Sequence, residues 1–466
     1  MSLPSASDNR FLTAPPGRLF VANAVPMMVL MMMGGLQSVV DAVFLGHFVG
    51  ADALAAVSIV FPVLMITVAL STLVGGGMSS LLARHLGAGA HAEAEEVFAE
   101  AHGLALVLAA VVIAGFLIGG RFVTGGLAGD RPEIARMAHT YLAIVIAALP
   151  VQLFLGIHAD AWRNEGRAGL VAVMSVAITL GNIALNYLLI VRLDMGVAGS
   201  AWGTAVAQAL GLAVLVGLRC RGGVLSIAAL GRSRWIGGWR EILALGAPVS
   251  LSFIGIALVS ATVIAILRLT AGPGYADIVA AYGIVTRILG FTFLPLMAIA
   301  LANQSIVGNN VGAKLYHRSN AVLRIALATA FAYCLVVEIT LLAGHRWIGA
   351  GFVGDPAVVA QVGDILRPMV ALYLFTGPVL VHALYFQAIG QPRRTAALIL
   401  LKPFVLSPLL IASLGVFVGA RAIWLAFPVA DGIVAVLAVG IALASRSDRH
   451  GGIGAALTER QQMPMP

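Results

Sequence analysis

The sequence predicts an all-α polytopic membrane protein with twelve transmembrane helices in two similar six-helix halves. Three observations predict this fold class: the composition, long uninterrupted apolar segments, and an internal repeat. Of the 466 residues, 60% are hydrophobic and only 10% are charged, and the mean hydropathy is +1.00. Soluble domains have about a quarter of their residues charged. A lipid environment removes the need for a polar surface, because stretches of about 20 apolar residues can face acyl chains.

The apolar segments are continuous rather than alternating, which favours helices over the strands of a closed barrel. Only these two structures pair every backbone group inside a bilayer. Charged and Gly/Pro-rich breaks divide the chain into twelve predicted spans. They cover residues 19–46, 54–83, 97–120, 137–160, 168–191, 197–218, 241–268, 278–308, 321–344, 366–390, 395–418 and 421–445.

The basic residues predict the orientation of these spans. With the N-terminus inside, the loops assigned to the cytoplasm contain roughly twice as many Lys and Arg residues as the opposite face, Lys314, Arg393 and Lys402 among them. This is the sign that the positive-inside rule requires. Arg far outnumbers Lys, and Ala and Gly are abundant, as in proteins of GC-rich bacteria. We therefore expect a multi-pass protein of a bacterial inner membrane with both termini cytoplasmic.

Several function classes are excluded. The net charge of +8 does not indicate nucleic-acid binding, because the charges lie between apolar segments rather than on one face. Cys220 and Cys334 are isolated, and the chain has neither metal-site spacing nor a P-loop lysine. We expect no cofactor or metal, no enzymatic activity, a small-molecule substrate, contact with membrane lipid, and a monomer.

The two halves of the chain repeat at an offset near 224 residues. AVP ending at Pro26 matches GAP ending at Pro248, and LGAGAHAEA from Leu86 matches VGAKLYHRS from Val311. Six spans return the chain to the same side, so the halves are parallel-related about an axis along the membrane normal. The predicted organisation is an N-terminal cytoplasmic tail, an N-lobe, a basic linker, a C-lobe and a C-terminal cytoplasmic tail, at residues 1–18, 19–218, 219–240, 241–445 and 446–466.

Several segments of the sequence resemble those of a known family. QSVVDAVFLG from Gln37, SSLLARHLGAGA from Ser79 and NIALNYLLI from Asn182 are similar to segments of multidrug and toxic compound extrusion (MATE) transporters. IVTRIL, IVGNNVGAK and YFQAIGQPRR in the second half resemble the DinF-like branch in particular. The resemblance covers about residues 19–445. It implies a V-shaped pair of lobes, a central cavity, and export driven by proton or sodium entry.

Asp41 is the first candidate for coupling transport to an ion. A charged side chain at the centre of a bilayer costs about 2.5–3.5 kcal/mol on insertion scales, and binding of a proton would remove that charge. Pro26 lies 15 residues earlier in the same predicted span and kinks the helix. The alternative is that Asp41 faces a water-filled lumen without a coupling role.

A group of polar side chains accompanies Asp41 in the first half. Asn182 and Asn186 are four residues apart and share one helix face, and Thr204 begins the sixth span. The resemblance implies an N-lobe cluster that binds the coupling cation. The matching residues are Asp41, Tyr141, Asn182, Asn186 and Thr204. The amides alternatively join helices by hydrogen bonds.

One difference between this sequence and DinF-like transporters bears on the identity of the coupling ion. Some DinF-like transporters have Asp at the position of Asn186, so the cluster here contains one carboxylate instead of two. A single titratable Asp favours protons, although oxygen ligands also suit sodium. The segment GAPVSLSFIGIALVSATVIAIL of the seventh span, residues 246–267, and the core of the tenth span contain no carboxylate, which argues against a second cation site in the C-lobe.

Other polar or flexible residues within spans are candidates for a substrate cavity. Met side chains crowd the first span and adapt to varied ligands, although such residues more often pack or face lipid. Glu338 is expected to reach the membrane surface from the outer end of the ninth span. The predicted cavity residues are Met31, Gln208, Arg287 and Asp431.

These observations predict a secondary active antiporter that exports amphiphilic, often cationic, drugs or metabolites in exchange for protons. A sodium-coupled exporter of the same family and an exporter of lipid-linked precursors or metabolites are alternatives within this class. A channel or a membrane-embedded enzyme is the alternative from a different class.

Overall fold

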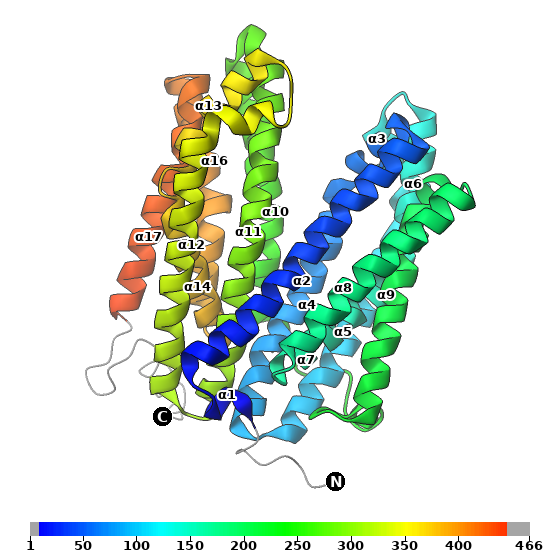
Figure 1. Ribbon diagram of the computed structural model, residues 1–466, viewed down its shortest axis with the longest axis vertical. Coiled ribbons are helices and arrows are strands. Elements are labelled where there is room, and N and C mark those ends of the chain that lie inside the picture. Colours follow the sequence, from blue (N-terminus) through cyan, green and yellow to red (C-terminus); the bar gives the residue numbers. More distant parts are fainter. Residues whose placement is uncertain (1–8, 445–466) are drawn as a thin grey trace. The chain divides into compact units, whose positions relative to one another are not determined.

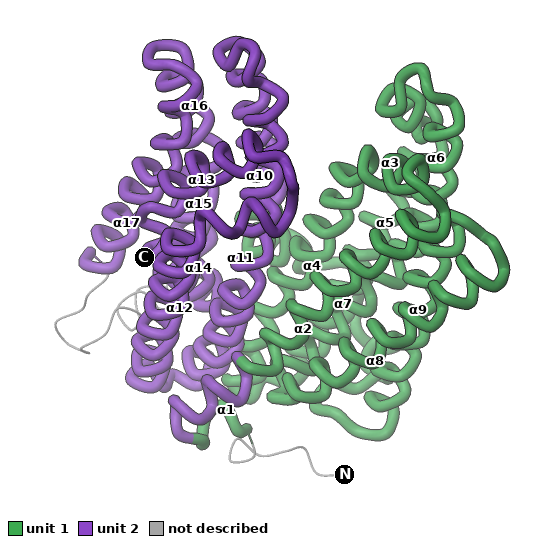
Figure 2. Tube along the Cα trace, turned by 45° about the horizontal axis from the view of Figure 1, so that its top comes forward, with its two compact units in different colours: residues 1–14, 25–250 green, residues 15–24, 251–466 purple. Residues whose placement is uncertain are grey.

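A computed structural model describes residues 9–444, so the predicted C-terminal tail lies outside the described residues. Within that range every regular element is helical. The chain divides into two compact units, which Figure 2 colours separately. One unit contains Val25–Ser250 and the N-terminal segment as far as Ala14. The other contains Pro15–Ala24 and the chain from Leu251 onward.

The first unit begins with a short helix and continues with long apolar ones (Figure 1). Its helices are α1 (Arg10–Thr13), most of α2 (Pro16–Phe44), α3 (Ala51–Ile59), α4 (Phe61–Ala88), α5 (His91–Ala128), α6 (Pro132–Ala147), α7 (Leu149–Asn164), α8 (Ala168–Asn186) and α9 (Gly196–Arg221). Two π-helical turns, η2 (Leu45–Val49) and η3 (Tyr187–Arg192), continue α2 and α8, and a 3-10 turn, η4 (Ile227–Gly231), follows α9.

The second unit has the same kind of architecture. Its elements are most of α10 (Trp239–Thr270), η5 (Gly272–Gly274), α11 (Tyr275–Gly312), α12 (Tyr316–Ala350), α13 (Pro356–Val370), η6 (Tyr373–Phe375), α14 (Thr376–Ala388), α15 (Pro392–Leu401), η7 (Lys402–Leu406), α16 (Ser407–Phe417), η8 (Ala420–Leu425) and α17 (Ala426–Ala444).

The division between the units falls inside two long helices rather than in loops. It lies between Ala24 and Val25 in α2 and between Ser250 and Leu251 in α10. Each of these points lies within one helical turn of a proline inside the helix, Pro26 in α2 and Pro248 in α10. A proline removes a backbone hydrogen bond from a helix interior and so permits a bend at these places.

The described helices include ten that are long and apolar enough to cross a membrane, and up to twelve when two bent pairs are each counted as one span. The pairs are α6 with α7, bent by 46°, and α13 with η6 and α14, bent by 47°. They coincide with the predicted spans 137–160 and 366–390. The prediction of an all-helical polytopic membrane protein is therefore confirmed.

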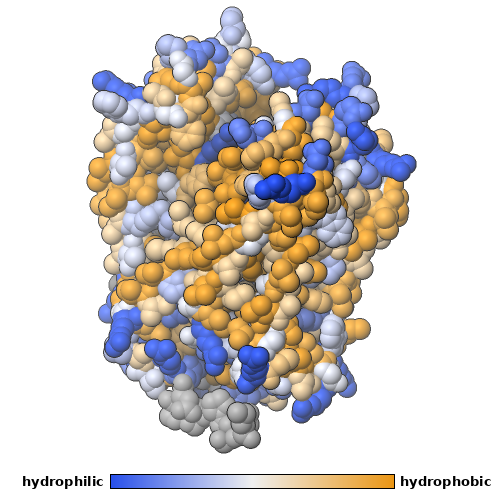
Figure 3. Space-filling model, turned by 45° about the vertical axis from the view of Figure 1, so that its right-hand side comes forward, coloured by the Kyte–Doolittle hydropathy of each residue, from blue (hydrophilic) through white to orange (hydrophobic). Residues whose placement is uncertain are grey.

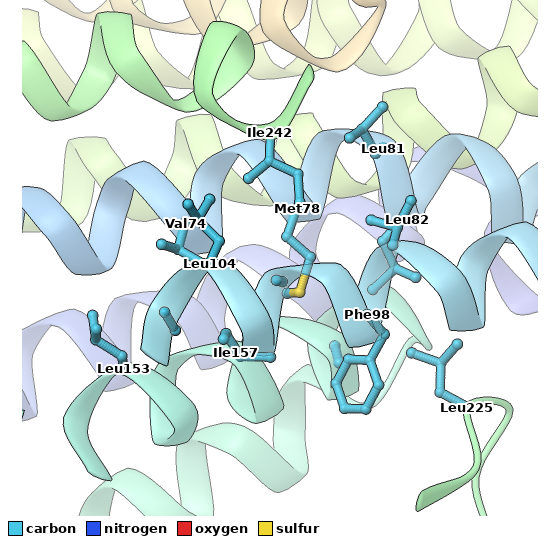
Figure 4. Packing of buried hydrophobic residues seen from close by; sticks show 14 of the residues in the cluster. Val74, Met78, Leu81, Leu82, Phe98, Leu104, Leu153, Ile157, Leu225 and Ile242 are labelled. Carbon is cyan, nitrogen blue, oxygen red and sulfur yellow. The ribbon is translucent and has the colours of Figure 1, made fainter. Parts of the chain in front are cut away.

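Packing in the first unit centres on a cluster of fully buried apolar side chains (Figure 4). Val74, Met78 and Leu82 of α4 pack against Phe98 and other residues of α5. Leu153 and Ile157 of α7, Leu225 after α9 and Ile242 of α10 complete the cluster. The start of α10 therefore packs inside this unit.

The exposed side chains indicate that lipid surrounds the middle of the protein. On the face drawn in Figure 3, apolar side chains cover the middle and hydrophilic ones gather towards the ends. Large apolar side chains are almost fully exposed, Ile118 at 90%, Phe122 at 86% and Phe417 at 86%. Water-exposed patches of this kind are rare in soluble monomers, whereas acyl chains cover them without cost.

Two expectations about charged residues are wrong. Lys402, which was counted with the cytoplasmic loops, lies in η7 inside the candidate span Pro392–Phe417. Glu338, which was expected to reach the membrane surface, is 9% exposed. Both side chains instead have partners within the second unit, because a buried charge needs an opposite charge or hydrogen-bond donors.

Candidate functional site

The polar residues predicted in the first half meet at one place in the first unit. Asp41 lies in α2, Asn182 and Asn186 lie in α8, and Thr204 lies in α9. Asn182 and Asn186 are fully buried, and Asp41 is half-buried. The spacing of four residues places both amides on the face of α8 that packs against α9.

Asp41 and Asn186 form the central hydrogen bond of this cluster. Asn186 Nδ2 donates to Asp41 Oδ1 at 2.6 Å, between residues 145 positions apart in the chain. The π-helical turn η2 begins four residues after Asp41, and η3 begins directly after Asn186. Both helices thus change their winding next to the bonded pair, and such π-turns are frequent at functional sites.

Asn182 and Thr204 extend the network. In the amide orientation that satisfies its neighbours, the Asn182 oxygen accepts from Thr204 N at 3.2 Å and from Thr204 Oγ1 at 3.0 Å. The Asn182 nitrogen then donates to Asp41 Oδ1 at 3.1 Å. One carboxylate oxygen therefore receives hydrogen bonds from two buried amides, which hold the side chain of Asp41 in place.

A glycine makes room for this arrangement. A Cβ added to Gly203 of α9 would overlap Oδ1 of Asn186. The close approach of the α9 backbone turns the oxygen of Asn186 towards Gly203 while the nitrogen faces Asp41. Small residues at helix contacts permit such approaches in membrane proteins. Nothing in the sequence distinguishes Gly203 except its position next to Thr204.

Tyr141 borders the cluster from α6. Its side chain is 8% exposed and lies near enough to Asp41 to interact with the carboxylate electrostatically. Tyr141 belongs to a cluster of buried residues that also contains Ile134, Leu142 and Ile146 of α6. The five residues predicted for ion coupling, Asp41, Tyr141, Asn182, Asn186 and Thr204, are thus near neighbours.

The predicted cavity residues do not all join this cluster. Met31 of α2 and Gln208 of α9 are half-buried, with Gln208 one turn beyond Thr204. Arg287 is exposed on α11, and Asp431 is buried on α17. Asp431 accepts a charge-assisted hydrogen bond from Lys402 Nζ. This ion pair was missed because Lys402 was assigned to a loop, although the predicted span 395–418 already enclosed it.

The fold and the site are those of a polytopic α-helical membrane protein with a half-buried carboxylate held by two buried amides in its first unit. A family model described as MatE matches two segments, residues 26–188 and 248–411, which are more than half of the chain. The chain belongs to the MatE family, a family of transporters rather than enzymes.

Two curated relatives span nearly the whole chain. The multidrug export protein MepA of Staphylococcus saprophyticus is 24% identical over 407 residues, which are 86% of this chain and 88% of that protein. A protein of Shewanella oneidensis named FAD transporter is 25% identical over 432 residues, with coverage of 90% and 93%.

Solved structures share the fold. A MOP superfamily transporter from Pyrococcus furiosus superposes with a TM-score of 0.85 at 22% identity, covering 94% of this chain and 97% of that chain. An outward-facing multidrug resistance MATE transporter superposes with a TM-score of 0.85 at 21% identity, covering 99% and 98%. The predicted MATE fold is therefore confirmed.

Proposed function

We propose that this exporter carries amphiphilic, often cationic, drugs or metabolites out of the cell in exchange for protons that bind Asp41. The observation that supports the proposal is the hydrogen-bonded cluster of Asp41 with Asn182 and Asn186. A proton on Asp41 cancels the charge that the two amides solvate, so the bonds that join α2 to α8 weaken. Proton binding in this way favours a different position of α2.

Pro26 is the bending point that we propose for α2. A helix with a proline in its interior lacks one hydrogen bond and bends at low cost. Movement of α2 about Pro26 would change which side chains, Met31 among them, face the substrate. We propose further that residues 19–218 and 241–445 move as two lobes in alternating access, joined by residues 219–240. Gln208, Arg287 and Asp431 are proposed to contact the substrate.

Sodium is the second candidate for the coupling ion. The oxygen of Asn182, the hydroxyl of Thr204 and the carboxylate of Asp41 form a set of hard oxygen ligands that suits such a cation. Protons are favoured because both amides direct nitrogen donors, not oxygens, at the carboxylate. The amide orientation thus solvates an anion rather than a metal ion.

The substrate class is proposed from the relatives. The names of the curated relatives refer to multidrug export and to FAD transport, so an exported metabolite is the alternative to drugs. Export of a lipid-linked precursor is less favoured, because a phosphate would need basic residues. Arg287 is the single base predicted for the cavity, and Lys402 is already paired with Asp431. We also propose the DinF-like branch, a monomer, and a bacterial inner membrane with both termini cytoplasmic.

The test is efflux of a fluorescent cation from everted vesicles under an imposed pH gradient, with and without sodium. We expect gradient-driven transport that needs no sodium and is lost in Asp41→Asn. Asp52→Asn is the matched control, since Asp52 is an exposed acid at the start of α3. Strict sodium dependence would replace the proton by sodium, and unchanged transport in Asp41→Asn would remove Asp41 from the mechanism.

A further inference from the structure

Two turns at one end of the second unit carry basic residues and no acidic ones. Lys314 and Arg318 lie where α11 ends and α12 begins, and Arg393 and Arg394 lie where α14 ends and α15 begins. Lys314 and Arg393 are exposed, whereas Arg318 and Arg394 are half-buried. These four residues are called the basic patch below.

The helices that carry the basic patch have no acid near it in the sequence. Residues 278–337 and 365–430 contain neither Asp nor Glu. Glu338, the first acid after Arg318 on α12, lies roughly 30 Å further along the helix axis. Asp431, the first acid after Arg394, is paired with Lys402. The positive charge of the patch is therefore not balanced by nearby acids of α11, α12, α14 or α15.

The two turns lie side by side. α14 packs against both α11 and α12. Ser319, the residue after Arg318, contacts Tyr385 in the last turn of α14. Gln304 of α11 donates from Nε2 to Oε1 of Gln387, also in the last turn of α14, at 2.8 Å. The patch is therefore one surface that two turns share.

Contacts hold two of the four bases in place. Arg318 Nε donates to Asn310 Oδ1 at 3.1 Å, and the guanidinium group of Arg394 lies over the ring of Phe386, 5.5 Å from its centre. Stacking of this kind orients a guanidinium group while leaving its charge in place. The patch thus has a fixed layer of positive charge beneath two exposed bases.

The turn that carries Lys314 occurs in both units. In the second unit, Lys314 N bonds the carbonyl three residues earlier at 3.0 Å, and the next amide bonds the carbonyl five residues before it at 2.7 Å. In the first unit, Gly89 and the next amide form the same two bonds, at 3.3 and 2.9 Å. Both residues are left-handed, with φ 71° at Gly89 and φ 60° at Lys314.

A lysine is the less suitable residue for this turn. Glycine adopts the left-handed conformation without steric cost, and helices commonly end in this way on a glycine. A lysine there carries the strain of its Cβ against the backbone. The second unit therefore has a base at the position where the first unit has the residue that the backbone favours.

The charge that follows this turn is reversed between the units. In the repeat, Arg318 corresponds to Glu93, and Glu95 and Glu96 follow Glu93 in the first unit. The positive-inside rule favours bases in such loops, but acids contribute little to it. Orientation in the membrane therefore does not explain why the second unit lacks acids here, whereas a negatively charged partner does.

We propose that the basic patch binds the phosphate headgroup of an anionic phospholipid. The two turns connect consecutive candidate spans and so lie at the boundary between lipid and water, where headgroups are. Basic clusters next to spans attract anionic lipids. Lys314 and Arg393 reach the headgroup from the two turns, and one lipid bridges them. The site rests neither on the role of Asp41 nor on the orientation of the chain.

The test is native mass spectrometry of the full-length protein in detergent, titrated with dioleoyl phosphatidylglycerol or with zwitterionic dioleoyl phosphatidylcholine. We expect the first phosphatidylglycerol to bind more tightly than phosphatidylcholine. In the double variant Lys314→Gly with Arg393→Gln, the dissociation constant for phosphatidylglycerol should rise roughly 20-fold, and that for phosphatidylcholine should not change.

The matched control removes two exposed bases from the first unit. Arg232→Gln with Arg234→Gln alters the segment between α9 and α10, in which Ser226 N and Gly238 N bond the acids Glu95 and Glu100 of α5. This variant should bind phosphatidylglycerol as the wild type does. An equal loss of affinity in the control would overturn the proposal, since the effect would then follow total charge.

Lys314→Gly alone separates lipid binding from folding. It supplies the residue that the first unit has in the same turn, so the melting temperature should not fall, while the affinity for phosphatidylglycerol should fall roughly fivefold. Equal binding of the two lipids by the wild type would overturn the proposal, as would unchanged affinity in the double variant. Displacement of phosphatidylglycerol by excess inorganic phosphate would also overturn it, by indicating a site for free anions.

Discussion

At the scale of single residues, the site depends on the lack of a side chain at Gly203 as much as on the polar side chains of the cluster. Gly203 lets α9 approach α8, so that Asn186 keeps its oxygen against the α9 backbone and its nitrogen on Asp41. Gly203→Ala should displace Asn186 and lower proton-driven efflux about tenfold, with an overpacking cost of about 1–3 kcal/mol. Gly217→Ala, on an open face of the same helix, should transport normally. Equal activity of the two variants would contradict the proposed geometry.

A second residue-scale prediction concerns ion selectivity. Asn186→Asp places a second carboxylate at the 2.6 Å contact with Asp41 and exchanges a nitrogen donor for an oxygen ligand. The variant should bind sodium, whereas the wild type should not. Thermal unfolding with and without sodium measures this, because a ligand that binds the folded state raises the melting temperature. Asn186→Leu is the control and should not respond to sodium.

At the scale of elements, the end of α9 is joined to α7 by a buried ion pair. Arg219 and Glu165 are at most 1% exposed in their side chains, and Arg219 also stacks 4.3 Å from the ring centre of Trp162. Glu165 in addition accepts from Val224 N at 3.1 Å and Arg219 donates to Leu225 O at 3.1 Å, so the pair anchors the chain after α9.

Breaking this pair should destabilise the first unit. Glu165→Gln leaves Arg219 buried without a counter-charge, which costs about 3–5 kcal/mol. Thermal unfolding in detergent should show a clear loss of melting temperature. Glu133→Gln makes the same substitution in the exposed pair with Arg136, whose side chains are 70% and 76% exposed, and should cost about 0–1 kcal/mol. Similar losses in the two variants would show that the buried pair is not an anchor.

At the scale of the whole molecule, one exposed cysteine reports the orientation in the membrane. Cys220 is exposed near the end of α9 and Cys334 is buried. With both termini cytoplasmic, a membrane-impermeant maleimide should label everted vesicles and leave intact cells or spheroplasts unlabelled. Cys220→Ser should abolish the labelling. Labelling of intact spheroplasts in a Cys220-dependent manner would reverse the proposed topology.

The class of protein could be predicted from the sequence, because it depends on properties that are summed along the chain and not on how the helices pack. Apolar composition and the length of uninterrupted apolar segments predict membrane spans without knowledge of their neighbours. The predicted spans overlap the helices and the two bent pairs, although the breaks at Val60, near Ala148 and near Leu372 were not predicted.

The candidate coupling site could be predicted from the sequence only in part. The amides of α8 share a face through local spacing, and their association with Asp41 and Thr204 came from resemblance rather than from any contact visible in the sequence. The structure places these residues together. It also supplied Gly203, for which the sequence held no distinct signal.

Composition, apolar segments and motifs were enough to predict that this chain is a helical membrane protein and which family it resembles. The pairing of Lys402 with Asp431 and the hydrogen bonds of Glu338 to the backbone at Leu372 became visible only in the folded chain. They could not be predicted because a helix in lipid is apolar on its buried and its exposed faces alike. The hydrophobic pattern that orients a helix in a soluble protein is then weak, and the partner of each buried charge is set by packing between helices distant in the chain.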